Sequence, residues 1–178
     1  LLFLNNDTEI IHDDTLDWMV GYASMDHCGC VGAKLLYPDH KVQHAGVVLG
    51  FGGVAGHIYV ANSYDDNGMF GRLAMPYNYT AVTAACLMIQ KSRFEEAGGF
   101  DENLKVALND VDLNLSVSSR GYYNVCLSNV EVLHYESKSR GYEASAEKQN
   151  RFRLEQEYMI SKWGSRLDRD PYFSKYNF

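Results

Sequence analysis

The chain has 178 residues, 46% of them hydrophobic and 22% charged, and its 23 acidic and 16 basic side chains give a net charge of −7. This composition excludes a disordered or fibrous chain, and the acidic balance argues against a nucleic-acid partner, which usually requires a basic face. The length fits a single domain over residues 1–178. No apolar run approaches about 18 residues, so the sequence predicts no transmembrane segment.

The distribution of charge and the cysteine spacing further limit the kinds of site that the protein can contain. Residues 1–133 hold 16 acidic and 7 basic side chains, a balance that suits a bound divalent cation, whereas residues 134–178 are slightly basic. The basic tail suits either a solvated helix or a contact with phosphate. The cysteines lack the spacing of a zinc site, which predicts free thiols in a reducing cytoplasm. They are Cys28, Cys30, Cys86 and Cys126.

The first third of the chain alternates strand and helix patterns. An apolar run at Leu1–Leu4 predicts a strand that ends in the turn-forming segment NNDT. Asp13 or Asp14 can cap the next helix, in which apolar residues recur at i, i+3, i+4 and i+7. These residues are Leu16, Met19, Val20 and Ala23. Two further runs, Cys30–Leu36 and Val42–Leu49, predict strands on either side of a proline-containing turn.

The middle of the chain contains a long glycine-rich stretch. Residues 50–76 include six glycines and show no period, which predicts a long irregular loop of the kind that is usually functional or mobile. The nearly continuous apolar run Tyr79–Gln90 predicts a strand buried on both faces. A short helical turn at Phe94–Ala97 then stops at two glycines.

The last third predicts two helices around two strands. A helix runs from Asn109 to Arg120, the strands are Tyr122–Leu127 and Val130–Tyr135, and a long polar helix runs from Ser145 to Trp163. Residues 145–178 thus form a C-terminal helix and tail. Strands alternating with helices predict an α/β domain with a mixed sheet.

Side chains that can bind a metal or act as acid or base stand at three places where predicted strands or helices begin or end. Asp7 follows the first strand, Asp110 and Asp112 open a helix, and His134 lies near the end of the last strand. Ligands of open α/β sheets gather at the carboxyl ends of strands. A carboxylate and an imidazole that converge there could hold a cation.

Each of these residues also has an ordinary structural explanation. Asp7 could be a turn residue, Asp110 the N-cap of its helix, and His134 a core histidine. His40 and His44 have the four-residue spacing of a zinc pair, but they lie in a turn and a strand rather than in a helix. Taken singly, the residues leave both interpretations open.

In combination, four ordered segments resemble glycosyltransferase family 2. The segments are LFLNNDT, TAACLMIQKSRFEEAGGFDENL, NDVDLNLSVSSRGY and VLHYESKSRG, and the resemblance extends from Leu1 to about Tyr172. The family consists of inverting enzymes with the GT-A fold, and this branch is similar to those that build bacterial surface polysaccharides such as rhamnose-containing chains. The resemblance implies a partial GT-A fold, a mixed sheet flanked by helices, that lacks the N-terminal nucleotide-binding βαβ part of complete members.

The resemblance also implies roles for individual residues. Asp7 occupies the metal-ligand position of the family's D-x-D motif, with Asn5 in place of the first acid on the donor side. His134 matches a further ligand of Mn²⁺ or Mg²⁺. Asp110 matches the general base that deprotonates the acceptor hydroxyl, and Asn109 replaces the glutamate that often precedes it. On the acceptor side the resemblance implies the residues Ala84, Ala85, Asp101, Asn109 and Asp112.

The implied reaction is the transfer of a sugar, with inversion, from a nucleotide-sugar donor to a saccharide acceptor in cell-surface polysaccharide biosynthesis. The implied location is the cytoplasm, with peripheral association at the inner face of the membrane. Because the donor part is missing, residues 1–178 alone are expected to show weak or absent transfer. The first strand would have lost neighbours, and an open sheet edge of this kind favours a homodimer or a swapped oligomer.

Two other functions remain open. Asn5 and Asn109, amides where the family often has acids, favour a non-catalytic carbohydrate-binding or interaction module with a degenerate site. A metal-dependent hydrolase could use Asp7, Asp110 and His134, but the sequence lacks a nucleophile motif and a carboxylate cluster for two metals.

Overall fold

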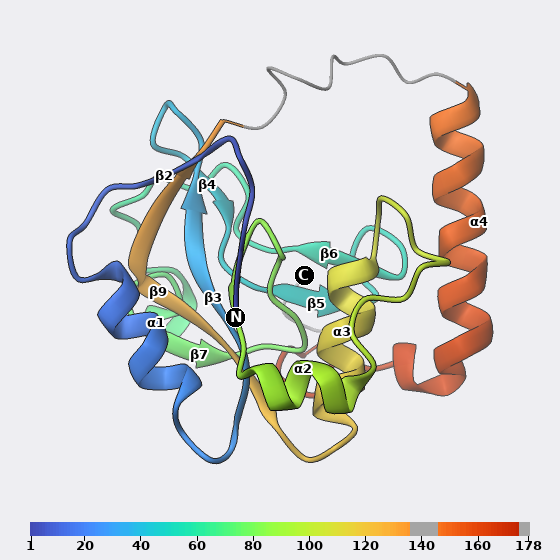
Figure 1. Ribbon diagram of the computed structural model, residues 1–178. Helices are drawn as coiled ribbons and strands as arrows, with labels where there is room; N and C mark the ends of the chain where they lie inside the picture. Colours follow the sequence, from blue (N-terminus) through green and yellow to red (C-terminus); the bar gives the residue numbers. More distant parts are fainter. Residues whose placement is uncertain (136–145, 175–178) are drawn as a thin grey trace.

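The computed structural model of the protein describes residues 1–135 and 146–174. Within them, a seven-stranded mixed sheet has the order β1-β8-β3-β9-β2, with β4 added to β3 and β7 added to β9 (Figure 1). β3 and β9 run parallel, and the other pairs are antiparallel. The strands are β1 (Leu2–Leu4), β2 (Thr8–Ile10), β3 (Cys28–Leu36), β4 (Val42–His44), β7 (Pro76–Asn78), β8 (Cys86–Met88) and β9 (Tyr123–His134).

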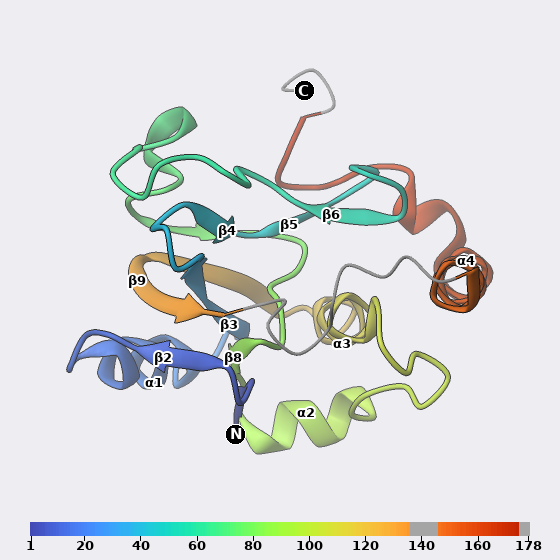
Figure 2. The same ribbon diagram turned by 90° about the horizontal axis from the view of Figure 1, so that it is seen from above.

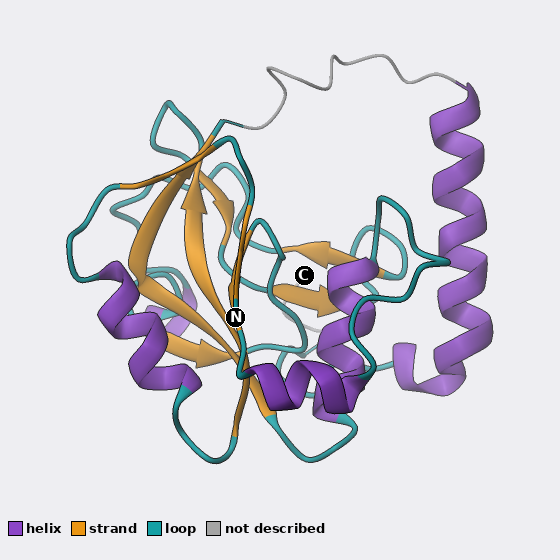
Figure 3. Cartoon of the chain, in the orientation of Figure 1, coloured by secondary structure: helices purple, strands orange, loops and turns teal. Residues whose placement is uncertain are grey.

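A second, two-stranded sheet and the helices surround the main sheet. The small sheet pairs β5 (Val47–Leu49) with β6 (Ala55–His57). The helices are α1 (Thr15–Ala23), α2 (Lys91–Ala97), α3 (Asn109–Ser118) and α4 (Ala146–Trp163), with 3₁₀ turns η1 (Met69–Gly71) and η2 (Gly164–Leu167). The predicted mixed α/β architecture is confirmed (Figure 3).

The two faces of β3 belong to two different apolar clusters. Every residue of β3 is buried. Val31, Ala33 and Leu35 point to the α1 side, whereas Cys30 on the opposite face packs with α3 and β5. Because side chains alternate along a strand, a strand buried on both faces must be apolar almost throughout. Figure 2 shows the resulting layers, with the β5–β6 sheet on one side of the main sheet and α1 on the other.

Helix α1 contacts the sheet through a narrower stripe than its sequence pattern predicts. Met19 and Ala23 are buried as expected, and they share their face with Thr15. Leu16 and Val20, which have the same helical spacing, are 44% and 52% exposed. Each follows a buried residue by one position, and one position turns the side chain by about 100° around a helix axis.

Four of the predicted strands have different limits in the structure. The run Val42–Leu49 divides into β4 and β5, which belong to different sheets. The run Tyr79–Gln90 retains only β8 as a strand, and its first half is buried through other contacts, such as the side chain of Asn114 on the backbone of Val82. Conversely, the two strands predicted after residue 121 form the single strand β9, with a register shift opposite Ala33 and Lys34.

Gly46 is the point at which the chain leaves the main sheet. Its φ of +113° is strained for residues with a side chain, and a Cβ there would lie 2.6 Å from the buried ring of Tyr79. The chain can therefore pass from β4 to β5 only because this residue has no side chain.

We expect Gly46→Ala to lower the free energy of unfolding by about 3 kcal/mol, since strain at positive φ adds to a clash with a buried ring. Gly50→Ala is the matched control, because Gly50 also has positive φ (+73°) but has open space where a Cβ would lie. It should cost about 1 kcal/mol. Chemical denaturation measures both, and equal losses would contradict the role given to the Tyr79 ring.

The glycine-rich stretch over residues 50–76 is largely irregular, as predicted, with β6 and η1 within it. The buried amine of Lys34 holds this stretch to the sheet. It donates to the carbonyl oxygens of Leu73 and Tyr64 and forms an ion pair with Glu131 at 2.8 Å. The loop is therefore anchored to strand β3 of the main sheet, although it has little regular structure.

The four cysteines are free and buried, as predicted, and burial raises the pKa of the Cys28 and Cys86 thiols to about 11. Strand β1 lies at the end of the sheet, where Leu2 and Leu4 are 36% and 43% exposed. Dimerisation through this edge stays a prediction.

Among the described helices, none combines the length and the apolar character that crossing a membrane requires.

Candidate functional site

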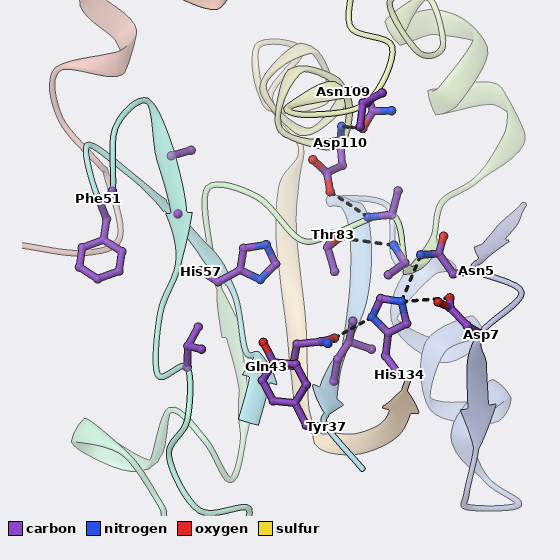
Figure 4. A pocket seen from close by; sticks show the side chains of 18 of the residues that line it. Asn5, Asp7, Tyr37, Gln43, Phe51, His57, Thr83, Asn109, Asp110 and His134 are labelled. Atoms are coloured by element: carbon purple, nitrogen blue, oxygen red, sulfur yellow. Dashed lines mark hydrogen bonds and ion pairs between the residues drawn. The ribbon is translucent and has the colours of Figure 1, made fainter. Parts of the chain in front are cut away.

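A pocket of about 630 Å³ opens where β1 and β9 end, beside the start of α3 (Figure 4). It is bounded on the far side by the β5–β6 sheet. Seven of the nine residues predicted for the site line it, although they come from four separate stretches of the chain. They are Asn5, Asp7, Ala84, Ala85, Asn109, Asp110 and His134.

Asp7 and His134 are neighbours because of the register between β2 and β9. Thr8 pairs with His134, and the backbone N–H of Tyr135 donates to the carbonyl oxygen of Asp7 at 2.8 Å. The carboxylate Oδ1 of Asp7 consequently lies 3.2 Å from Nε2 of His134. The antiparallel ladder thus joins two residues that are 127 positions apart in the sequence.

The ring of His134 is oriented by Gln43. Nδ1 of His134 lies 2.7 Å from Oε1 of Gln43, and because an amide oxygen accepts, Nδ1 must donate. In the neutral ring Nε2 then carries a lone pair, which faces the Asp7 carboxylate and the side-chain amide of Asn5, at 3.2 Å each. A lone pair and a carboxylate that face each other need a proton or a cation between them.

This arrangement has the features of a partial cation site. Histidines that bind metals commonly use one nitrogen for the ion and donate the other N–H to a nearby oxygen, as His134 does to Gln43. Over residues 1–135 and 146–174, no group of three or more His, Cys, Asp or Glu side chains forms a complete metal site. Asp7 and His134 could therefore hold an ion only if further ligands, from outside the described His, Cys, Asp and Glu side chains, completed its coordination.

Asp110 lies at the opposite end of the pocket, in the first turn of α3. Its Oδ2 accepts a hydrogen bond from the Ala84 N–H at 3.2 Å, and its Oδ1 accepts one from the Val111 N–H at 2.8 Å. The interpretation of Asp110 as the N-cap is wrong, because Leu108 occupies that position with a φ of +62°. The carboxylate is half-buried and held in place, with one edge toward the pocket.

Asp101 and Asp112 lie outside the pocket lining and contact α4 instead. Both carboxylates accept hydrogen bonds from Lys162, and Asp112 also accepts one from the Trp163 indole at 2.8 Å. The hydrogen bonds from Lys162 and Tyr158 hold the pKa of Asp101 well below its ordinary value. Asp112 follows Asp110 by two positions, a turn of about 200° around the helix, so it points away from the pocket.

Glu155 on α4 was not recognised from the sequence, yet it supports the segment before Asp110. Its buried carboxylate accepts hydrogen bonds from the backbone N–H groups of residues 105, 106 and 107, at 3.2, 3.3 and 2.9 Å. Together with Lys162, it fixes the path of the chain into α3. One glutamate within a polar helix carries no sequence signal for such a contact.

Part of the pocket lining lies outside the predicted site residues and consists of Tyr37, Gln43, Phe51, His57 and Thr83. Phe51 and His57 belong to the stretch predicted as a loop, whereas Gln43 and Thr83 lie in runs predicted as strands. His40 and His44 do not form a pair, in line with their positions in a turn and a strand: the Nδ1 atoms of His44 and His57 lie 3.1 Å apart, and the ring of His40 makes a tilted contact with Tyr64. The two partners are 13 residues apart, and the glycine-rich turn between β5 and β6 brings them together.

Comparison with known proteins gives similarities to longer bacterial proteins, whereas no family model matches the chain. The chain is 47% identical over 172 residues to the uncharacterized protein y4gI of Sinorhizobium fredii, a match that covers 96% of the chain and 19% of that protein. It is 40% identical over 148 residues to the O-antigen biosynthesis protein RfbC of Myxococcus xanthus, covering 83% of the chain and 12% of that protein. The chain thus spans about a fifth and about an eighth of these relatives.

A shorter match involves an N-acetylglucosaminyl-diphospho-decaprenol L-rhamnosyltransferase of Mycobacterium tuberculosis. It shows 35% identity over 60 residues, which is 34% of the chain and 20% of that protein. The chain is therefore similar to segments of longer bacterial proteins, of which one is named for O-antigen biosynthesis and another for rhamnosyl transfer.

Proposed function

We propose that the chain is the acceptor-side portion of an inverting glycosyltransferase of family 2. It would transfer a sugar from a nucleotide-diphosphate donor to a saccharide acceptor during surface-polysaccharide biosynthesis. The names of two relatives support sugar transfer of this kind. The observation that carries the proposal is that one pocket holds a fixed carboxylate, Asp110, and a separate Asp7–His134 pair suited to a cation.

Asp7 and His134 are the residues that would hold Mn²⁺ or Mg²⁺. The ion, when bound, neutralises the negative charge of a diphosphate leaving group. Gln43 keeps Nε2 of His134 available by accepting a hydrogen bond from its Nδ1–H, and the imidazole in the ligand set mildly favours Mn²⁺. Oxygen atoms of the diphosphate would supply ligands beyond these two side chains.

Asp110 would accept the proton of the attacking acceptor hydroxyl. The N–H groups of Ala84 and Val111 hold its two oxygens, so the carboxylate keeps one orientation without a second acid beside it. Asn109 is neutral, and its side-chain oxygen accepts from the Asp110 N–H at 2.8 Å, which fixes the first turn of the helix. A base within hydrogen-bond reach of the hydroxyl is what attack on the opposite face of the donor sugar requires.

A thermal-shift experiment on residues 1–178 tests the donor side of the proposal. The panel is UDP, GDP and dTDP, each with and without Mn²⁺. A ligand at 100 times its Kd adds about 2.7 kcal/mol to the free energy of unfolding, so the melting temperature should rise by several degrees. We expect this rise with one nucleotide, only with Mn²⁺ present, and not in Asp7→Ala.

Asp13→Ala is the matched control, because Asp13 is an exposed carboxylate in the turn before α1. It should keep the full shift. A full-length protein that contains this chain is measured in parallel, since the chain spans only about a fifth of the y4gI relative. The absence of a Mn²⁺-dependent shift in both proteins would contradict the proposal.

One observation favours a second function, a non-catalytic carbohydrate-binding module. Asn5 and Asn109 are amides at positions where the resembled family often has acids, and both line the pocket. Such a module would bind saccharides without any Mn²⁺-dependent response to nucleoside diphosphates, so the same experiment separates the two functions.

A further inference from the structure

Two histidines form a pair beside the pocket, on the β5–β6 side. His44, at the end of β4, is fully buried, whereas His57, at the end of β6, is half-buried and lines the pocket. Their Nδ1 atoms are 3.1 Å apart, and the ring planes meet at 72°. In Figure 4 the His57 ring points from its strand into the pocket, on the opposite side from His134.

The surroundings of His44 determine which of its nitrogens carries the proton. The backbone N–H of Thr83 points at Nε2 of His44 at 3.5 Å. A backbone amide can only donate, so Nε2 must be the acceptor. Burial, together with the nearby His57 and His134, lowers the pKa of His44 well below its ordinary value, so the ring is neutral. Its single proton is therefore on Nδ1.

The proton position in His44 determines that of His57. With Nδ1–H of His44 as the donor, Nδ1 of His57 must accept, because the two atoms share one hydrogen bond. A neutral His57 then carries its proton on Nε2. Two successive hydrogen bonds, from the Thr83 N–H to His44 and from His44 to His57, thus set the tautomer of a side chain that lines the pocket.

We infer that His57 binds the acceptor saccharide, with its Nε2–H donating a hydrogen bond to a sugar hydroxyl oxygen, and that His44 is the positioning residue that fixes this tautomer. The inference rests on the function proposed above. A neutral N–H donor suits a hydroxyl group, whereas an anionic diphosphate would be better matched by a cationic side chain. Tyr37 and Phe51 also line the pocket and offer aromatic surface for the apolar face of a sugar.

Histidine NMR on residues 1–178 tests the tautomers without any need for transfer activity. Long-range ¹H–¹⁵N spectra near neutral pH should show His57 protonated on Nε2 and His44 protonated on Nδ1. His57→Gln and His44→Asn assign the two sets of signals. The opposite tautomer at either ring would overturn the inference.

The positioning role of His44 is tested with a variant that removes its N–H donor. His44→Leu should release His57 into a mixture of tautomers, whereas His44→Asn retains a side-chain N–H near the position of Nδ1 and should preserve the Nε2–H form. His40→Asn is the matched control, because His40 is exposed in the preceding turn. An unchanged His57 tautomer in His44→Leu would show that His44 does not position it. If His44→Leu does not fold, His44→Ala, which also lacks a side-chain donor, provides the same comparison.

Sugar binding is tested with N-acetylglucosamine and L-rhamnose as probes at high concentration. We expect one of them to shift the His57 Nε2–H signal without Mn²⁺, and no shift with either sugar would overturn the binding role. In the full-length protein, His57→Phe should raise the KM for the acceptor roughly tenfold with little change in the donor KM, and His57→Gln should retain most of the affinity. A wild-type protein without transfer activity would reject the proposed function, while the NMR result would still decide the role of His57.

Discussion

Asp110→Asn should abolish sugar transfer by the full-length protein while Mn²⁺ and nucleoside diphosphate binding stay intact. The substitution keeps the size of the side chain and an oxygen that can accept from one of the two N–H groups at Ala84 and Val111. It removes the ability to take a proton from the acceptor hydroxyl. A general base contributes about 10²–10⁴ in rate, and kcat should fall by a factor in this range.

Steady-state kinetics at saturating substrate measure this loss, and the thermal shift with Mn²⁺ and nucleotide checks that the site is otherwise intact. Asp13→Asn, at an exposed carboxylate outside the pocket lining, should leave both quantities unchanged. Normal turnover in Asp110→Asn would show that another group accepts the proton. Loss of nucleotide binding together with turnover would instead point to a structural role for Asp110.

Glu155→Ala should lower the free energy of unfolding by about 2 kcal/mol and also lower transfer, although Glu155 lies outside the pocket. Three backbone N–H groups, at residues 105–107, lose the charged acceptor that holds them. The segment they belong to leads directly into Asn109 and Asp110, so its displacement moves the carboxylate. Water can reach part of this segment, which keeps the expected loss at the lower end for charged hydrogen bonds.

Glu157→Ala provides a matched control on the same helix. Glu157 is exposed and pairs with Arg153 at i,i+4, an arrangement that contributes at most a few tenths of a kcal/mol. Urea denaturation compares the two variants, and kcat is measured in the full-length protein. Equal stabilities and equal activities would show that the contact of α4 with residues 105–107 does not support the site.

Several elements of the fold were predictable because their signals are local. Strand β3 is a continuous apolar run, α2 stops at Gly98 in a left-handed conformation, and α3 follows a polar loop. The strand limits were less predictable. An apolar run shows that a segment is buried, but the residues that pair with it are elsewhere in the chain, as the division of Val42–Leu49 between two sheets shows.

For the candidate site, the sequence alone determined which residue types could take part, because Asp7, Asp110 and His134 stand at recognisable strand and helix ends. Only the tertiary structure decided which of the predicted residues share a pocket. Asp101 and Asp112 resemble Asp110 in the sequence, yet they contact Lys162, since helix geometry and the packing of α4 determine their direction. The pairing of His44 with His57 was equally hidden, because a hydrogen bond between two rings depends on how separate strands are brought together in space.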